Sequence, residues 1–133
     1  MNEPAKSVAH TFVDTINRHD VNALAELMTA EHRFIDALGC VVEGREKMRA
    51  AWTAYFRMVP DYTLAIDESL SDGPVVAMLG SAGGTFTKDG ELKPENRWKT
   101  PAAIRAFIEN GKVAEWRVYA DNEPMRKIME KNG

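Results

Sequence analysis

The hydrophobic period of this chain changes near its middle, close to Pro60. Before that point, Val8, Phe12 and Ile16 recur every four residues, which is the spacing of one face of an amphipathic helix. After it, apolar and polar residues alternate over positions 62–70, which is the two-residue period of a half-buried strand. Helices first and strands after them predict an α+β fold, in which helices pack on one face of a curved, mostly antiparallel sheet.

Turn and breaker residues divide this pattern into elements. Asn-Gly at 110–111 is the strongest short-range hairpin signal, and Asp-Gly at 72–73 predicts another turn. Gly80, Gly83 and Gly84 fall within a strand pattern and indicate a bulge or bend, so the sheet is expected to form a cone-like pocket. The predicted elements are helices over 5–18, 21–29, 45–59 and 122–131, and a strand over 32–38 that precedes the later meander.

Size and charge limit the class of protein. The 133 residues predict one domain, residues 1–133, which can bury a core without disulfides or metals. A net charge of −3, with no cluster of basic residues, argues against a nucleic-acid partner. The longest apolar run, at 74–79, is too short to span a membrane. With no signal-peptide pattern and the single Cys40 at a strand edge, we expect a cytoplasmic protein.

The stretch HRFIDALG, residues 32–39, contains the most informative polar residue. Alternation places Asp36 on the same strand face as Phe34 and Leu38. Strands disfavour aspartate, and an unpaired buried charge is costly. Asp36 is therefore a turn former at the strand end, one half of an ion pair, or a functional acid or base, and these three alternatives stay open at this point.

Three segments together resemble one family. They are FVDTINRHDVNALAELMTAEHRFIDALG, VEGREKMRAAW and FIENGKVAEWRVYAD, which follow one another at that family's spacing. The chain resembles the nuclear transport factor 2-like superfamily, and within it the SnoaL-like polyketide cyclases and ketosteroid isomerases. The resemblance implies a cone-shaped sheet with three N-terminal helices that enclose a pocket (a cystatin-like fold), and a homodimer formed through the exposed face of the sheet.

The resemblance also implies site residues. Asp36 stands where ketosteroid isomerases keep a general base, and apolar walls would make its carboxylate a better base near neutral pH. The two oxyanion donors of those isomerases are missing, because their positions hold Phe12 and Arg105. Arg105 could stabilise an oxyanion, or pair with Asp36 or another acid across the cavity. Asp121 is the second catalytic candidate, although its simpler role is the cap of the last helix.

A flat hydrophobic ligand would need aromatic surface, and the chain supplies it. Tyr55 and Tyr119 carry hydroxyls that could replace the missing donor. The three histidines lack the spacing of a metal site, so neither a metal nor a cofactor is expected. The candidate ligand-binding residues are Phe12, Phe34, Trp52, Tyr55, Phe56, Trp116 and Tyr119.

Three functions follow from these observations. The first is cofactor-independent acid–base chemistry, as in an isomerase, cyclase or related lyase, in which Asp36 acts on a small hydrophobic carbonyl-bearing substrate. The second is a non-catalytic ligand-binding or dimerisation domain with Asp36 and Arg105 as a structural ion pair. The third is epoxide hydrolysis, with Asp36, Arg105 and Asp121 around a water. The sequence leaves open whether the chain is an enzyme, because this fold hosts all three.

Overall fold

Three helices form in the first half of the chain, where the four-residue period predicts them. The computed structural model describes residues 4–132, and its first helices are α1 (Ala5–Asn17), α2 (Val21–Glu26) and α3 (Arg45–Met58). In α1 the predicted stripe of Val8, Phe12 and Ile16 is buried. Asp20 caps α2, because its Oδ1 accepts the amide hydrogen of Ala23 at 3.1 Å.

The second half supplies the long strands of the sheet. They are β3 (Thr63–Asp72), β4 (Val75–Thr85), β5 (Arg97–Glu109) and β6 (Lys112–Ala120), and the 3₁₀ turn η1 (Pro94–Asn96) precedes β5. Asn110 and Gly111 both have positive φ, at 53° and 74°. The predicted Asn-Gly hairpin between β5 and β6 is therefore confirmed, since a two-residue turn of this type needs positive φ at both positions.

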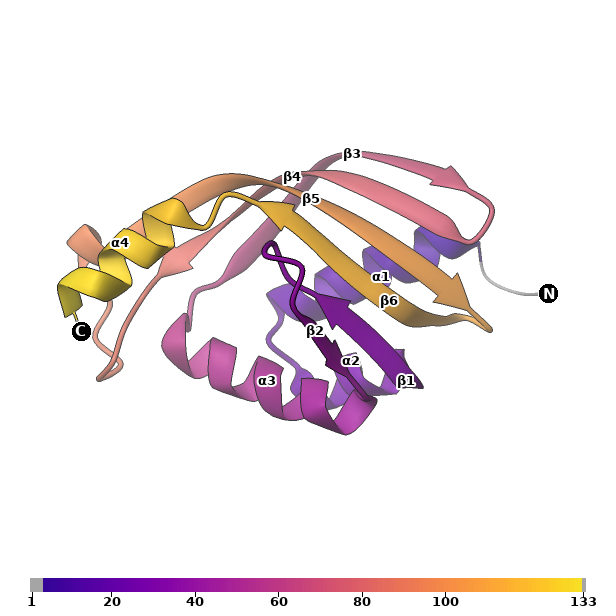
Figure 1. Cartoon of the computed structure of the whole chain (residues 1–133), viewed down its shortest axis with the longest axis horizontal. Coiled ribbons are helices and arrows are strands. Elements are labelled where there is room, and N and C mark those ends of the chain that lie inside the picture. The colour runs from indigo at the N-terminus through magenta and orange to yellow at the C-terminus, as the bar shows by residue number, and fades with distance from the viewer. Residues whose placement is uncertain (1–3, 133) are drawn as a thin grey trace.

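The sheet is mixed, curved and unclosed (Figure 1). With β1 (Met28–Ile35) and β2 (Val41–Glu43), its order is β2-β1-β6-β5-β4-β3. The β1–β6 pair is parallel and the other four pairs are antiparallel. The helices α1, α2 and α3 lie on the concave side, and α4 (Glu123–Asn132) lies at one end of the molecule. This arrangement confirms the predicted α+β fold with a curved, mostly antiparallel sheet.

Three predicted boundaries are wrong near the first strand. The second helix ends at Glu26 rather than at residue 29, and β1 already begins at Met28. Pairing with β6 overrides the local helical pattern, because Met28 is in register with Val113, whose amide donates to the Leu27 carbonyl at 2.7 Å. The strand also ends at Ile35 rather than at 38. The three-residue β2 was not predicted, since so short a strand has no readable period.

A glycine-associated bulge bends β3 and β4, as predicted. The register between them shifts between Ile66 and Glu68, where Ile66 pairs with Gly80. A Cβ atom added to Gly80 would lie 1.8 Å from the Ala65 carbonyl oxygen, a distance that no real side chain tolerates. The close approach of the two strands therefore requires glycine at position 80.

The core lies between the helices and the concave face of the sheet. Phe12, Met78 and Trp116 are among its largest fully buried side chains. Asn132 joins α4 to the turn before β5, since its Nδ2 donates to Asn96 Oδ1 at 3.0 Å. Within residues 4–132, no helix combines the length and the apolar character that a membrane crossing requires.

Candidate functional site

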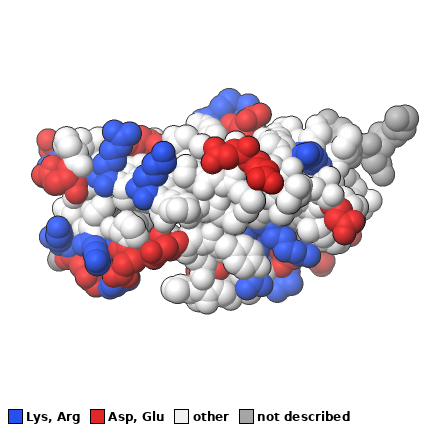
Figure 2. Space-filling model, turned by 90° about the horizontal axis from the view of Figure 1, so that it is seen from above, with Lys and Arg blue, Asp and Glu red and all other residues white. Residues whose placement is uncertain are grey.

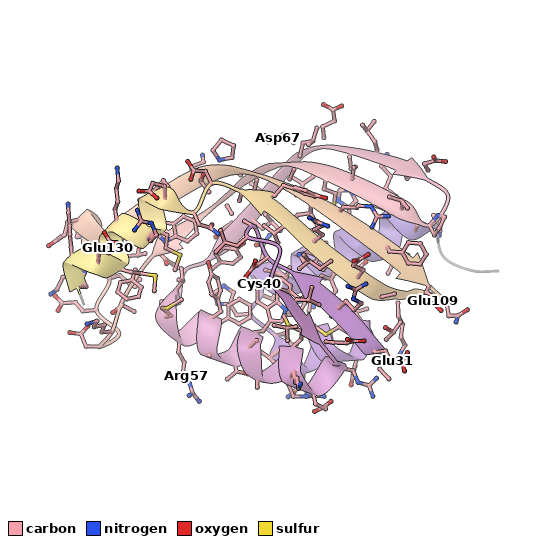
Figure 3. All side chains as sticks on the ribbon, viewed as in Figure 1. Glu31, Cys40, Arg57, Asp67, Glu109 and Glu130 are labelled. Carbon is pink, nitrogen blue, oxygen red and sulfur yellow. The ribbon has the colours of Figure 1, made fainter. Side chains whose placement is uncertain are left out.

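A pocket of about 310 Å³ lies on the concave side of the sheet. Its lining is mostly apolar and comes from the end of β1, from α3 and from the inner faces of β5 and β6. Figure 3 labels Cys40 at the turn between β1 and β2, and Asp67 on the opposite, outer side of the sheet. The pocket lining belongs to the inside of the curve of the sheet.

Strand alternation decides which β5 and β6 residues reach this pocket. On β5, even positions such as Trp98, Thr100 and Ile104 line it, and most of these side chains are buried. On β6, Trp116 and Val118 do the same. Residues between them point to the outer face, because successive side chains of a strand lie on opposite sides.

Asp36 has one of its three predicted roles, that of the turn former, and its side chain also lines the pocket. It follows β1 directly, and its Oδ1 accepts the amide hydrogens of Leu38 and Cys40, each at 2.9 Å. Asp36 is thus a turn former that closes the β1–β2 connection. The same side chain also lines the pocket, and no hydrogen bond to its Oδ2 occurs among the described residues. One carboxylate oxygen is therefore used by the turn and the other is unpartnered.

The predicted pairing of Arg105 with Asp36 is wrong. Arg105 has an odd position on β5 and lies on the outer face, where its Nη1 is 3.2 Å from Glu115 Oε2. Arg33 lies on the other side of the same carboxylate, with its Nη1 3.8 Å from Oε1. Arg105 therefore forms its ion pair on the outer surface of the sheet and does not line the pocket.

Asp121 also lies outside the pocket. Its Oδ1 accepts the amide hydrogen of Glu123 at 2.9 Å, at the start of α4. This is the helix-start role that we considered simpler for this residue. Arg105 is also outside the pocket, on the outer face of the sheet. The three residues expected for epoxide hydrolysis, Asp36, Arg105 and Asp121, therefore do not meet around one point.

Of the seven predicted ligand-binding residues, four line the pocket and three do not. Phe12 is a core residue whose ring centroid is 4.6 Å from that of Trp116. Phe56 stacks on His19, with a ring centroid separation of 4.1 Å. Tyr119 is 48% exposed on the outer face, beneath the guanidinium of Arg117. The four that line the pocket are Phe34, Trp52, Tyr55 and Trp116.

Sequence reasoning missed four polar or aromatic residues of the pocket. The alternation from 98 to 104 could have identified Trp98 and Thr100, since it places them on one face of a strand. Tyr62 begins the alternation over 62–70, which places it on the same face as Leu64, another lining residue. Asn122 gave no comparable signal, because it lies in a connection directly beside a helix. Only the tertiary structure brings Asn122 into the pocket.

Aromatic rings form a continuous wall of the pocket. Trp52 contacts Tyr55, Tyr55 contacts Tyr62, and Tyr62 contacts Trp98, with centroid separations of 6.2, 5.1 and 6.3 Å. Burial raises the pKa of Tyr55 far above its ordinary value and the pKa of Tyr62 to about 12. Both phenols therefore stay protonated near neutral pH.

Two hydrogen-bond donors on this wall are unsatisfied. The indole nitrogens of Trp52 and Trp98 are buried and have no hydrogen-bond partner within residues 4–132. An unmade hydrogen bond at a buried donor costs about 1–3 kcal/mol, so most such groups in proteins are paired. These two donors are enclosed by the protein, whereas the Asp36 side chain lines the pocket.

His32 is fully buried beside the core rather than in the pocket. Its Nδ1 lies 2.7 Å from the Val113 carbonyl oxygen, which can only accept, so Nδ1 carries the hydrogen. Its Nε2 is buried without a partner among the described residues. Burial lowers the pKa of His32 below 6.5, because a charged imidazole would lose its hydration there.

The described residues contain no group of three or more His, Cys, Asp or Glu side chains placed to hold a metal ion. The polar side chains among the lining residues carry instead one carboxylate, several hydroxyls and an amide. Such a set can bind an organic molecule through hydrogen bonds and aromatic contact.

Comparison with known proteins places this geometry in a family. Residues 9–116 match the model of the SnoaL-like domain. No curated protein matches the chain. Among solved structures, a candidate SnoaL-like polyketide cyclase from Shewanella denitrificans OS-217 superposes with a TM-score of 0.81, at 16% identity over 96% of this chain and 97% of that one.

Other similar structures carry different names. A hypothetical protein with a ketosteroid isomerase-like fold from Catenulispora acidiphila DSM 44928, in complex with trimethylamine, has a TM-score of 0.72 at 18% identity, over 84% of this chain and 83% of that one. An LEH-like epoxide hydrolase from M. tuberculosis has a TM-score of 0.78 at 13% identity, over 96% and 90% of the chains. At these identities the likeness concerns the fold. The family model covers most of the chain, and the protein therefore belongs to the SnoaL-like domain family.

Proposed function

We propose that this protein is a cofactor-independent enzyme that moves a proton next to the carbonyl group of a small hydrophobic molecule, as isomerases and cyclases do. In this proposal Asp36 Oδ2 takes a proton from the carbon beside the carbonyl. The C–H electron pair moves toward the carbonyl oxygen and forms an enolate, and Asp36 returns the proton to the same or another carbon. No oxidant, reductant or metal is needed, because atoms and electrons balance within the substrate.

The observation that carries this proposal is the position of the Asp36 carboxylate. It lines a pocket whose walls are mostly apolar and aromatic, and its Oδ2 accepts no hydrogen bond from the described residues. A base must have an unused lone pair within reach of the proton that it removes. Oδ1 meanwhile fixes the side chain to the turn, which limits how far Oδ2 can move.

The alternative function is a non-catalytic domain that binds a small hydrophobic ligand. The two turn hydrogen bonds of Asp36 Oδ1 favour this alternative, since they explain the aspartate without any chemistry. The ion pair with Arg105 is no longer part of it, because Arg105 pairs with Glu115. Epoxide hydrolysis is not proposed, since Asp36, Arg105 and Asp121 do not meet around a common point.

Hydrogen exchange in a model ketone separates the two functions. We would incubate 2-acetylnaphthalene with the protein in D₂O and follow the loss of its methyl proton signal by ¹H NMR. The proposal predicts exchange faster than in buffer alone, loss of that acceleration in Asp36→Asn, and no loss in Asp121→Asn. Asp121→Asn is a matched control, because that side chain is outside the pocket and its turn bond needs only an acceptor oxygen.

Two results would contradict the enzymatic proposal. Exchange no faster than in buffer, with binding of the ketone still seen in the fluorescence of the pocket tryptophans, would favour the ligand-binding alternative. Exchange that is equally fast in Asp36→Asn would show that another group removes the proton.

A further inference from the structure

A second hollow of the molecule, with a volume of about 290 Å³, lies across the ends of β3 and β4 and the start of β5. We call it the outer groove, because its exposed β5 residues have odd positions, and odd β5 positions face away from the Asp36 pocket. The residues of the outer groove that matter for its chemistry are Asp61, Thr63, Ser81, Gly83, Arg97 and Lys99.

A glycine gives the outer groove its depth. Gly83 is in register with Thr63 on one side and with Lys99 on the other, so the three form one row across β3, β4 and β5. A Cβ atom added to Gly83 would lie 2.6 Å from the Trp98 carbonyl oxygen, a distance that real side chains do not tolerate. The row therefore has no side chain at its centre, and the packing of the strands keeps this position free.

Two basic side chains lie along the β5 side of the outer groove. Arg97 and Lys99 are two residues apart on one strand face, about 6.6 Å along the strand, and both are exposed. Within residues 4–132, neither side chain forms an ion pair or a hydrogen bond, whereas Arg33 and Arg105 share Glu115. Figure 2 looks onto this face and shows Lys and Arg side chains next to each other toward the end at which β5 begins (Figure 1).

The other polar groups leave the outer groove with a surplus of positive charge. Asp61 is its one carboxylate, and both carboxylate oxygens accept hydrogen bonds from Thr85, at 2.7 Å each. The Thr63 hydroxyl donates to the Asp61 carbonyl at 3.2 Å. The Ser81 hydroxyl has no hydrogen-bond partner among the described residues and is available as a donor. Two cations and a free hydroxyl thus stand against one carboxylate that is already bonded.

We propose that the outer groove binds the phosphate or carboxylate group of a small organic molecule. The Arg97 guanidinium offers a planar fork to two oxygens, Lys99 adds a compact positive charge, and Ser81 supplies a hydroxyl donor. The hollow over Gly83 gives room for the rest of the molecule. This site is on the opposite face of the sheet from Asp36, and the inference does not depend on the proposed function.

Three probes of similar shape test the charge of the ligand. Phenyl phosphate and benzoate carry the anionic group, and benzamide is a neutral relative of benzoate. We would titrate each into the ¹⁵N-labelled protein at constant ionic strength and follow the amide signals of Ser81, Gly83 and Lys99. We expect saturable shifts of these signals with at least one anion and none with benzamide. The anion that binds more tightly identifies the group, phosphate or carboxylate, for which the groove is built.

Substitutions test the residues. Arg97→Gln and Lys99→Gln should each weaken anion binding about fivefold, as loss of one exposed charged contact allows, and added salt should reduce the difference. Arg57→Gln on α3 and Lys112→Gln at the β5–β6 turn change the net charge equally and are the matched controls, which should bind the anions as the wild type does.

A further variant tests the hollow itself. Ser81→Gln keeps both cations, but its longer side chain would occupy the outer groove and should also weaken binding. The ¹⁵N–¹H spectrum of each variant without ligand should match that of the wild type apart from signals near the substitution, which shows that the variant is folded.

Four results would overturn the inference. Absence of saturable shifts with both anions, or equal shifts with benzamide, would show that the groove does not recognise an anionic group. Equal weakening in the two control variants would show that only net charge matters. A mass in light scattering that is halved by phenyl phosphate would show that the groove is an interface between two copies of the chain. Hydrogen exchange in the ketone is measured separately, so none of these results bears on the role of Asp36.

Discussion

Two backbone hydrogen-bonding groups of Cys40 are paired with Asp36. The Cys40 amide donates to Asp36 Oδ1 at 2.9 Å, and the Asp36 amide donates to the Cys40 carbonyl oxygen at 3.0 Å. The same Oδ1 accepts the amide hydrogen of Leu38. Asp36, the first catalytic candidate from the sequence, therefore also shapes the turn next to the pocket.

This double role makes the stability of Asp36 variants informative. Asp36→Ala removes the acceptor of two turn amides, and we expect it to cost about 1–2 kcal/mol of the free energy of unfolding. Asp36→Asn keeps an acceptor oxygen and should cost less than half of that. Urea unfolding measures both values. Equal losses in the two variants would mean that the charge of Asp36, rather than its hydrogen bonds, holds the turn.

The buried His32 should make the protein less stable in mild acid. Its folded-state pKa is below 6.5 because of burial, so the unfolded chain binds a proton more readily than the folded one. Its contribution to stability is complete above pH 6.5 and decreases as the pH falls from 6.5 toward the folded-state pKa, by at most about 1.4 kcal/mol per pH unit.

Urea unfolding at several pH values tests this effect. In His32→Asn, whose amide can still donate to the Val113 carbonyl, the fall in stability below pH 6.5 should be smaller than in the wild type. His10→Asn is the matched control, since that histidine is only half-buried and its Nε2 contacts the Ser69 hydroxyl. An unchanged pH dependence in His32→Asn would refute the prediction.

Arg105 should matter little for either stability or ligand binding. Its guanidinium pairs with Glu115 on the outer face, and its side chain is 40% exposed. Exposed ion pairs contribute about 0–1 kcal/mol and are screened by salt. A double-mutant cycle with Arg105→Met and Glu115→Gln should give a coupling energy in this range that falls with added salt. Weaker binding of 2-acetylnaphthalene in Arg105→Met would instead connect this residue to the pocket.

The outer face of the sheet is the surface through which we expect a homodimer to form. Leu79, Ala103 and Tyr119 are in register across β4, β5 and β6, and Leu79 and Tyr119 are 42% and 48% exposed. Figure 2 shows the molecule from above, with uncharged surface between scattered charged groups. Burial of these apolar side chains between two copies would favour association.

Light scattering coupled to size-exclusion chromatography measures the assembly. We expect the mass of two chains for the wild type and of one chain for Leu79→Glu, which would bury a charge in the interface. Leu38→Glu is the control, because Leu38 is highly exposed at the β1–β2 turn, away from the outer face. A single-chain mass for the wild type would refute the expected dimer.

Much of the fold was predictable because its determinants are local. The four-residue spacing of Val8, Phe12 and Ile16 reports one helix face, and the Asn110-Gly111 pair reports a turn whose backbone few other residues adopt. The end of α2 was not predictable in this way. It depends on Val113, a residue more than eighty positions later in the chain, which pairs with the segment after the helix.

Residues of the site could be predicted only where the neighbouring residues in the sequence indicate the position of the side chain. Asp36 stands out because an aspartate after Phe34 and Ile35 needs an explanation, and the structure places it both in a turn and in the pocket lining. Arg105 was assigned to the wrong face, since its side depends on the register of β5 in the sheet. Tyr62 begins the alternation over 62–70, but only the folded chain shows that this face adjoins the pocket.

The sequence by itself determined the order of the helices and long strands, the position of the β5–β6 turn and the residue most in need of a function, because periodicity, backbone preference and the cost of a buried charge act over a few residues. The tertiary structure decided which side chains share the pocket. Strand register separated Arg105 from Asp36, and the curve of the sheet brought Tyr62 beside Trp98. Such contacts depend on hydrogen bonds and packing between distant segments, which only the folded chain brings together.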